Sequence, residues 1–160
     1  PASVQAGVSA IHEKRHALER YWAEGPLTMI HGDSHVGNIY FVGSEAGFFD
    51  WQVAQYHQGV RDLAYFLVLS LDTELRRTHE RALFGRYCDK LIESGMQRTD
   101  LDREWLFERY RSFSLYAYMG ASVTATMSDL QPETVARLGL QRSATAVDDL
   151  DALDLLRHLV

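Results

Sequence analysis

The chain has a single cysteine, Cys88, among its 160 residues. One thiol cannot form a disulfide within the chain, so disulfide-stabilised folds are excluded. Apolar residues recur at helical spacing through the surrounding segment 83–92, which predicts a buried structural thiol and not a nucleophile. The near absence of cysteine is consistent with a reducing compartment, and we expect a cytoplasmic protein.

The sequence also lacks long hydrophobic runs and an excess of positive charge. No apolar stretch approaches the roughly 20 residues needed to cross a bilayer, and residues 1–10 lack the basic start and apolar block of a signal peptide. Sixteen basic and twenty-two acidic residues give a net charge of −6. This balance argues against nucleic acid or an anionic membrane as a partner. Because nearly half of the residues are apolar, we expect a soluble globular domain with its own core.

The apolar periodicity predicts a mainly helical α+β fold with one small β-hairpin, formed as a single domain over residues 1–160. A strand is expected over 27–30, and the hairpin is expected from strands 39–42 and 48–51 around a turn at 43–47. Helices are expected over 3–22, from Asp62 to Ser70, over 73–94 with Gly95 as the C-cap, from a cap at Thr99 or Asp100 through Val123, and as a pair after Pro132.

Two short segments carry the chemistry. Residues 31–38 read His-Gly-Asp-Ser-His-Val-Gly-Asn, and residues 48–52 read Phe-Phe-Asp-Trp-Gln. Four residues separate Asp33 from Asn38, and Asp50 follows after the predicted hairpin. This is the spacing of a kinase catalytic loop, with a base Asp, an Asn for Mg²⁺ and a second metal-binding Asp. The pattern therefore predicts phosphoryl transfer, in which oxygen ligands hold Mg²⁺ and a carboxylate orients the acceptor hydroxyl.

These motifs make the sequence similar to the aminoglycoside phosphotransferase and choline kinase-like superfamily, small-molecule relatives of the protein kinases. The resemblance rests on the loop at 31–38, on Asp-Trp-Gln at 50–52, and on Gly59 followed by Asp-Leu-Ala at 62–64. It is strong over residues 27–69. It implies the carboxy-terminal lobe of a protein-kinase-like fold, with a catalytic loop at 31–38, a metal motif at 48–52 and a helical subdomain at 62–160.

The resemblance also implies a role for each matching residue. Asp33 would be the catalytic base, and Asn38 and Asp50 would bind Mg²⁺ and through it the nucleotide, ATP or GTP. The loop-shaping residues would be His31, His35 and Asp62, with Asp62 capping the loop backbone from the start of a buried helix. Three residues near the metal motif are weaker candidates for contact with the substrate: Trp51, Gln52 and Tyr56.

One part of a kinase is missing from the pattern. Kinase-like enzymes take a phosphate-covering loop and a lysine from an amino-terminal lobe. The residues before 27 predict one helix with no Gly-rich loop, and neither Lys14 nor Lys90 is suitably placed. We expect the chain to be one lobe of a longer protein, with the missing amino-terminal lobe as its partner, and to be inactive alone.

The leading prediction is an ATP-dependent phosphotransferase whose acceptor is a hydroxyl of a small molecule, such as an aminoglycoside or another metabolite. A metal-dependent hydrolase built from His31, Asp33, His35 and Asp50 is an alternative, binding Mn²⁺ or Zn²⁺ without nucleotide. A kinase-like lobe retained only for binding is another. The position of Asn38 fits the hydrolase less well. The sequence does not indicate the oligomeric state.

Overall fold

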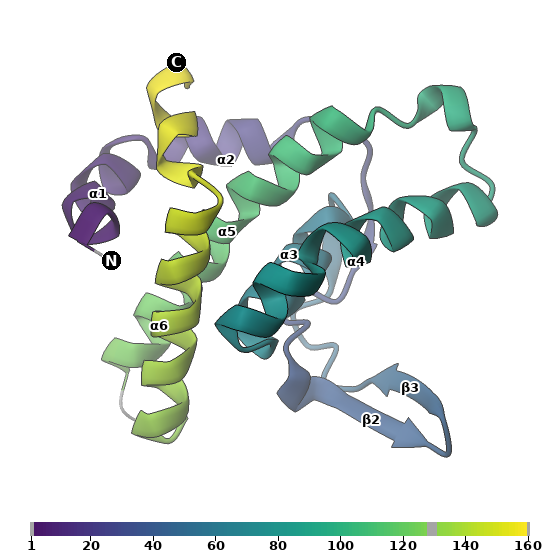
Figure 1. Ribbon diagram of the computed structural model, residues 1–160, viewed down its shortest axis with the longest axis horizontal. Coiled ribbons are helices and arrows are strands. Elements are labelled where there is room, and N and C mark those ends of the chain that lie inside the picture. The colour runs from purple at the N-terminus through teal and green to yellow at the C-terminus, as the bar shows by residue number, and fades with distance from the viewer. Residues whose placement is uncertain (1, 128–130, 160) are drawn as a thin grey trace.

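The structure is a computed structural model that describes residues 2–127 and 131–159 (Figure 1). Within these ranges helices dominate, and the strands form two antiparallel sheets of two strands each, so the prediction of a mainly helical α+β fold is confirmed. The strands are β1 (Thr28–Ile30), β2 (Ile39–Val42), β3 (Glu45–Phe48) and β4 (Gln55–His57). The α-helices are α1 (Ala2–Glu13), α2 (Arg15–Ala23), α3 (Val60–Ser70), α4 (Thr73–Glu93), α5 (Arg103–Thr126) and α6 (Glu133–Asp149), and the 3₁₀ helices are η1 (Val36–Asn38), η2 (Arg98–Asp100) and η3 (Ala152–His158).

Helix α3 is the central element of the core. It packs against both α5 and α6, and it buries Val60, Ala64, Leu67 and Val68. Its sequence is apolar on most faces because helices surround it on more than one side. Burying one such large apolar side chain contributes roughly 1.5–3 kcal/mol, so α3 has a rigidly defined position. The predicted burial of Cys88 on α4 is also confirmed.

A buried network of charged side chains joins α4, α5 and α6. Arg76 of α4 is 2 % exposed and pairs with Glu80 at 2.8 Å and with Asp149 of α6. The Tyr110 hydroxyl of α5 donates to the Glu80 carboxylate at 2.7 Å. Arg77 adds hydrogen bonds to both oxygens of Asp149, which hold the pKa of that carboxyl below its usual range. Each buried charge thus has a partner, as charges removed from water require.

The sheets differ in two respects from the sequence prediction. The strand predicted over 27–30 is present as β1, but it pairs with β4, which was not predicted. The hairpin is present, yet its turn is the two-residue Gly43-Ser44 and its second strand is β3, three residues earlier than expected. Residues 49–51 leave the ladder because the chain turns sharply at Asp50, where φ is 63°.

Three helix boundaries also differ. The single helix predicted over 3–22 is two helices that meet at Lys14, whose Nζ donates to the Leu159 carbonyl at 2.8 Å. Asp102, not Thr99 or Asp100, caps α5 by accepting from the N–H groups of Glu104 and Trp105, both at 3.0 Å. The pair expected after Pro132 is α6 followed by the 3₁₀ helix η3.

Helix α4 ends as predicted. Gly95, at φ 110°, donates its N–H to Ile92, and the Met96 N–H donates to Leu91, which is the Schellman pattern of a helix C-terminus.

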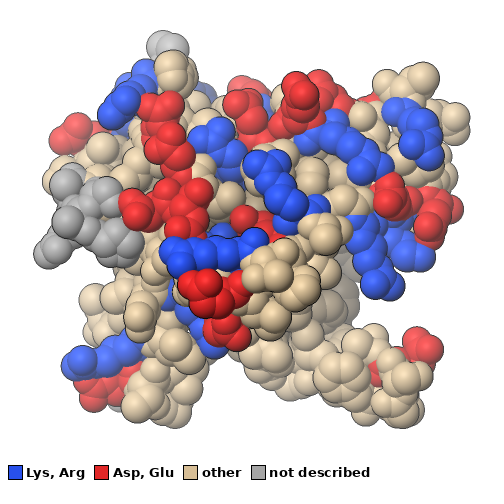
Figure 2. All heavy atoms as spheres, viewed as in Figure 1, with Lys and Arg blue, Asp and Glu red and all other residues tan. Residues whose placement is uncertain are grey.

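Figure 2 shows acidic and basic side chains intermixed over the helices on one face. The β2–β3 hairpin, at the lower right, carries few charges and exposes apolar side chains such as Phe41 and Val42. In the part of the chain that the structure describes, no helix is long and apolar enough to cross a membrane.

The buried network gives a stability prediction. Tyr110→Phe removes the hydroxyl that donates to buried Glu80, so we expect the free energy of unfolding to fall by about 1.5–3 kcal/mol, the usual contribution of a hydrogen bond to a charged group. Urea denaturation followed by circular dichroism measures the change. Tyr56→Phe is the control, because Tyr56 is 76 % exposed and its loss should change stability by less than about 0.5 kcal/mol. Equal effects of the two substitutions would contradict the role given to the network.

Candidate active site

The loop that follows β1 is anchored on α3. The backbone N–H groups of His31 and Gly32 donate to the two carboxylate oxygens of Asp62, at 2.6 and 3.0 Å. The Ser34 hydroxyl donates to the Asp62 carbonyl at 2.8 Å. Further along, the Val36 N–H donates to the hydroxyl of Ser70 at 2.9 Å. The first and last turns of α3 therefore hold the loop at both of its ends.

Gly32 is required by the tight approach of two backbone segments. Its φ is 86°, in the left-handed region, and a Cβ there would lie 2.5 Å from the Val53 carbonyl oxygen. Only glycine adopts this conformation without a steric penalty. The loop thus passes directly against the segment that follows Asp50, which brings the two sequence motifs together.

The His31 ring links the two motifs through hydrogen bonds. Its Nδ1 accepts from the Asp33 N–H at 3.2 Å, and its Nε2 donates to the Phe49 carbonyl at 2.8 Å. The tautomer with a proton on Nε2 satisfies both bonds. The ring also packs against Phe48 and Trp51, with centroid separations of 5.1 and 4.8 Å. His31 is buried and holds the residue before Asp50 next to the loop.

Hydrogen bonds to Asp33 orient the side chain of Asn38, and the backbone of Asn38 in turn holds Phe49. Its side-chain Nδ2 donates to the Asp33 carbonyl at 2.9 Å and to Asp33 Oδ2 at 3.1 Å. Its backbone carbonyl accepts from the Phe49 N–H at 3.0 Å. Because the amide nitrogen serves Asp33, the side-chain oxygen is the atom left for a cation.

Asp50 takes an unusual backbone conformation. Its φ of 63° lies in the left-handed region that non-glycine residues seldom adopt. Such conformations cost on the order of 1–3 kcal/mol and occur mainly at functional sites. The side chain is exposed, on the same pocket as Asp33 and Asn38.

These three residues line one pocket of about 650 Å³. His35, Gln52 and Tyr65 complete its polar end. The opposite wall comes from α5, α6 and the end of α3, and it is mostly apolar: Leu69, Ala121, Val135, Ala136, Leu138 and Gly139. A larger hollow of about 850 Å³, lined by Tyr87 and Trp105 among others, contains none of the loop residues, so the chemistry points to the smaller pocket.

Some of the remaining predicted site residues line the pocket, and others hold the loop from outside it. His31 and Asp62 lie beneath the loop and do not line the pocket. Of the three weaker substrate candidates, Gln52 lines it, whereas Trp51 and Tyr56 do not.

Tyr65 and Arg142 are among the pocket residues that were not found from the sequence. Tyr65 follows Asp62 by three residues on α3 and therefore lies on the same helix face. This spacing could have identified Tyr65 from the sequence. Arg142 lies on α6, more than one hundred residues from Asp33, and no local pattern connects them.

The surroundings of Asp33 favour its charged form. Hydrogen bonding from His35 is the main cause that holds its pKa below the usual range, against an opposing effect of burial. His35 Nε2 lies 3.5 Å from Asp33 Oδ2, and the Tyr65 hydroxyl and the Asn38 amide contribute in the same direction. Asp33 therefore remains a carboxylate near neutral pH and can accept a hydrogen bond from an incoming hydroxyl.

The geometry favours the kinase-like interpretation over the hydrolase. Both ring nitrogens of His31 are already engaged, by Asp33 and by Phe49, so this ring is not available as a metal ligand. Among the described residues, no three His, Cys, Asp or Glu side chains gather where they could hold a metal ion. Asn38 and Asp50 line the same pocket, and their side-chain oxygens are of the hard type that could hold Mg²⁺.

Comparison with known families identifies the family of the chain. The family whose model matches this chain belongs to the protein-kinase-like and choline kinase-like superfamily. Within it, the model of the ecdysteroid kinase-like family matches residues 9–98, more than half of the chain, and the chain belongs to that family. A comparison with curated proteins returned no match. The matched segment contains the loop, the Asp50 segment, α3 and α4.

The anchoring of the loop is open to a direct test. Asp62→Ala leaves the His31 and Gly32 N–H groups without their acceptor, and a buried unsatisfied group costs about 1–3 kcal/mol. We expect hydrogen exchange at these two amides to accelerate at least tenfold, measured by mass spectrometry or NMR. Asp72→Ala is the control, since Asp72 caps the exposed start of α4 and does not touch the loop. Unchanged protection of both amides in Asp62→Ala would show that the loop is held in another way.

Proposed function

We propose that the chain is the catalytic lobe of an ATP-dependent phosphotransferase that acts on a hydroxyl of a small molecule. The observation that carries the proposal is the convergence of Asp33, Asn38 and Asp50 on one pocket. Membership of a kinase-like family supports the same reaction.

Each of the three residues has a task in this reaction. Asp33 accepts a hydrogen bond from the acceptor hydroxyl and takes its proton as the hydroxyl oxygen bonds to the γ-phosphorus of ATP, while the bond from that phosphorus to the bridging oxygen breaks and ADP leaves. His35 and Tyr65 keep the Asp33 carboxylate charged, and Asn38 fixes its orientation. Positioning of this kind supplies much of the rate enhancement in phosphoryl transfer.

Asn38 and Asp50 are the residues that would hold Mg²⁺. Their side-chain oxygens are hard ligands, and the orientation of the Asn38 amide leaves its oxygen for a cation. When bound, the ion neutralises the charge that develops on the transferred phosphoryl group. The left-handed backbone of Asp50 directs this residue to the pocket that Asp33 lines.

We further propose that the acceptor has an apolar body. The wall of the pocket opposite Asp33 is formed mainly by apolar side chains of α5 and α6. The description of the family names ecdysteroids, which are hydroxylated polycyclic molecules, and an acceptor of this general type suits the division of the pocket into a polar end and an apolar wall.

The nucleotide requires a further lobe under this proposal. The two lysines are both engaged elsewhere: Lys14 bonds the Leu159 carbonyl, and Lys90 pairs with Glu93 at 2.5 Å. Neither lysine lines the pocket that Asp33, Asn38 and Asp50 share. We therefore propose that turnover needs an amino-terminal lobe and that residues 1–160 alone do not phosphorylate.

The proposed reaction is tested by single substitutions in the full-length protein. Asp33→Asn keeps the shape of the side chain but cannot take a proton, so we expect kcat to fall by about 10²–10⁴-fold. The measurement is Mg²⁺-dependent ATP turnover with a panel of ecdysteroids as acceptors. Asp72→Asn, at an exposed helix cap, is the matched control and should retain activity. Full activity in Asp33→Asn would refute the assignment.

The pH dependence of the reaction follows from the environment of Asp33. His35→Gln removes the main cause of the lowered pKa, so the pKa of Asp33 should rise. The acid limb of the kcat/KM profile should then move to higher pH, because Asp33 becomes protonated sooner as the pH falls. His79→Gln is the control, since His79 is exposed and does not line the pocket. An acid limb that stays in place would show that Asp33 does not control this part of the profile.

A further inference from the structure

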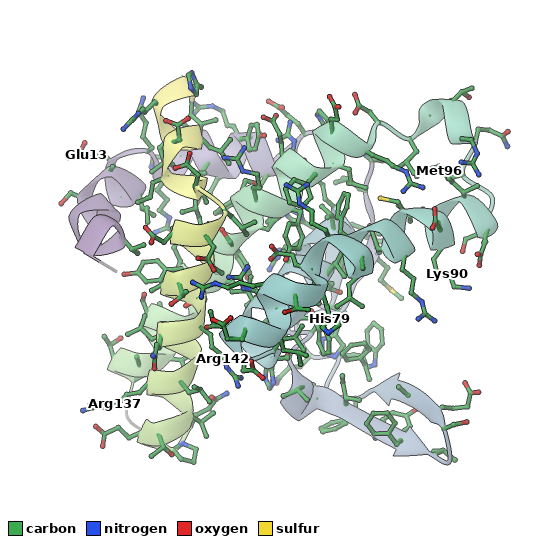
Figure 3. The ribbon with its side chains drawn as sticks, in the orientation of Figure 1. Glu13, His79, Lys90, Met96, Arg137 and Arg142 are labelled. Atoms are coloured by element: carbon green, nitrogen blue, oxygen red, sulfur yellow. The ribbon has the colours of Figure 1, made fainter. Side chains whose placement is uncertain are left out.

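One face of α6 forms part of the wall of the candidate pocket. Its residues are Val135, Leu138, Gly139 and Arg142, spaced as neighbours on one side of a helix. Figure 3 shows Arg142 on the side of α6 that faces the body of the molecule, whereas Arg137 points away from it. Val135 and Leu138 are 50 % and 44 % exposed, so their apolar side chains leave surface that an apolar molecule in the pocket would cover.

Arg142 fixes the position of this face. Its Nη1 donates to the carbonyls of Leu69 and Ser70, at 3.0 and 3.3 Å. These carbonyls lie at the C-terminal end of α3, where the last carbonyls of a helix lack partners within the helix. The Ser70 hydroxyl also accepts the Val36 N–H of the loop. The end of α3 therefore holds both the loop and the α6 wall, which gives the pocket between them a defined width.

Gly139 lies within this face, although the fold does not require glycine there. Glycine is the least favourable residue in a helix interior apart from proline. Among the described residues, a Cβ at position 139 would have only Leu69 Cδ2 within contact distance, at an ordinary 4.0 Å. A Cβ at Gly47, in contrast, would lie 2.4 Å from the Tyr40 ring. Alanine would thus fit at position 139, so the glycine there leaves open a space that the packing does not need.

The open space belongs to the pocket. Leu69, the side chain nearest to Gly139, also lines the pocket, so a side chain larger than a methyl group at position 139 would project beside it into the pocket. Without a side chain, a rigid ring system can approach the helix backbone closely. The wall at Gly139 therefore favours a broad, inflexible apolar body over a narrow one.

We propose that Gly139 is a specificity-determining residue that admits a rigid, multi-ring acceptor to the pocket. A larger side chain at this position would narrow the space and restrict the acceptor to slimmer alcohols. The inference rests on the proposed function and deepens it, because it assigns the width of the acceptor to one residue. It requires no charge on the acceptor, since Leu69, Val135 and Leu138 are all apolar.

A binding experiment on the full-length protein tests the inference. Two neutral alcohols serve as probes: ecdysone, which has four fused rings, and decahydro-2-naphthol, which has two. Calorimetric titrations are made with Mg²⁺ and β,γ-imido-ATP present, so no turnover is required. Wild-type protein should bind ecdysone more tightly. Gly139→Leu should weaken ecdysone binding by about 10- to 100-fold and leave decahydro-2-naphthol within about twofold, because only the broader body needs the space.

Two further variants separate the possible causes. Gly139→Ala adds only the Cβ that the position accommodates, so it should raise the melting temperature and weaken ecdysone binding by about two- to fivefold. Gly85→Leu is the matched control: Gly85 also lies inside a helix, α4, no described atom lies within 4 Å of a Cβ there, and it does not line the pocket. This control should change the affinity for neither probe. Unchanged affinity for β,γ-imido-ATP verifies that each variant is folded.

The proposal is overturned if wild-type protein binds ecdysone no more tightly than decahydro-2-naphthol, or if neither substitution of Gly139 weakens ecdysone binding. Equal weakening of both probes also overturns it, since the width of the acceptor would then make no difference. A loss confined to ecdysone in Gly139→Leu, alongside full turnover in Asp33→Asn, would uphold the inference and refute only the proposed phosphotransfer chemistry.

Discussion

The Asp62 carboxylate is the contact on which the site depends. It lies in the first turn of α3, a helix of the buried core, and accepts the N–H groups of His31 and Gly32. The packing of α3 in the core therefore determines the position of the loop. Because packed interiors resist small displacements, Asp33 is held by elements that have little freedom to move. This is the kind of support that precise positioning of a reacting group requires.

A second connection extends this support to the other motif. His31 contacts Asp33 through one ring nitrogen and Phe49 through the other, and the Asn38 carbonyl accepts the Phe49 N–H. Both polar backbone groups of Phe49 are therefore occupied by the loop. Asp50, the next residue, is placed by these bonds and not by the hairpin ladder, which ends at Phe48. Local hydrogen bonds thus place both residues that are proposed to hold the metal, Asn38 and Asp50.

The sequence predicted much of this arrangement because the motif residues are close together along the chain. The spacing of Asp33, Asn38 and Asp50 indicated the chemistry, and helical periodicity indicated α3 and α4. Features that depend on distant contacts were not predicted: the pairing of β4 with β1, the break at Lys14 where the end of the chain packs, and the contribution of Arg142. Residues of α6 lie far from the loop along the chain, so no local sequence pattern indicates that both line the same pocket. The roles of the individual site residues, including Asp62 and His35, stay predictions until the variants are measured.

The left-handed backbone of Asp50 has a consequence for how this protein can change. Glycine would relax the backbone there, yet it would remove the carboxylate, so the most stable residue at this position is not the most useful one. A chain selected only for stability would lose Asp50, and a chain selected for the site must keep the strain. Under the proposed function, aspartate at position 50 would therefore mark a protein that retains the chemistry, and glycine there would mark one that has lost it.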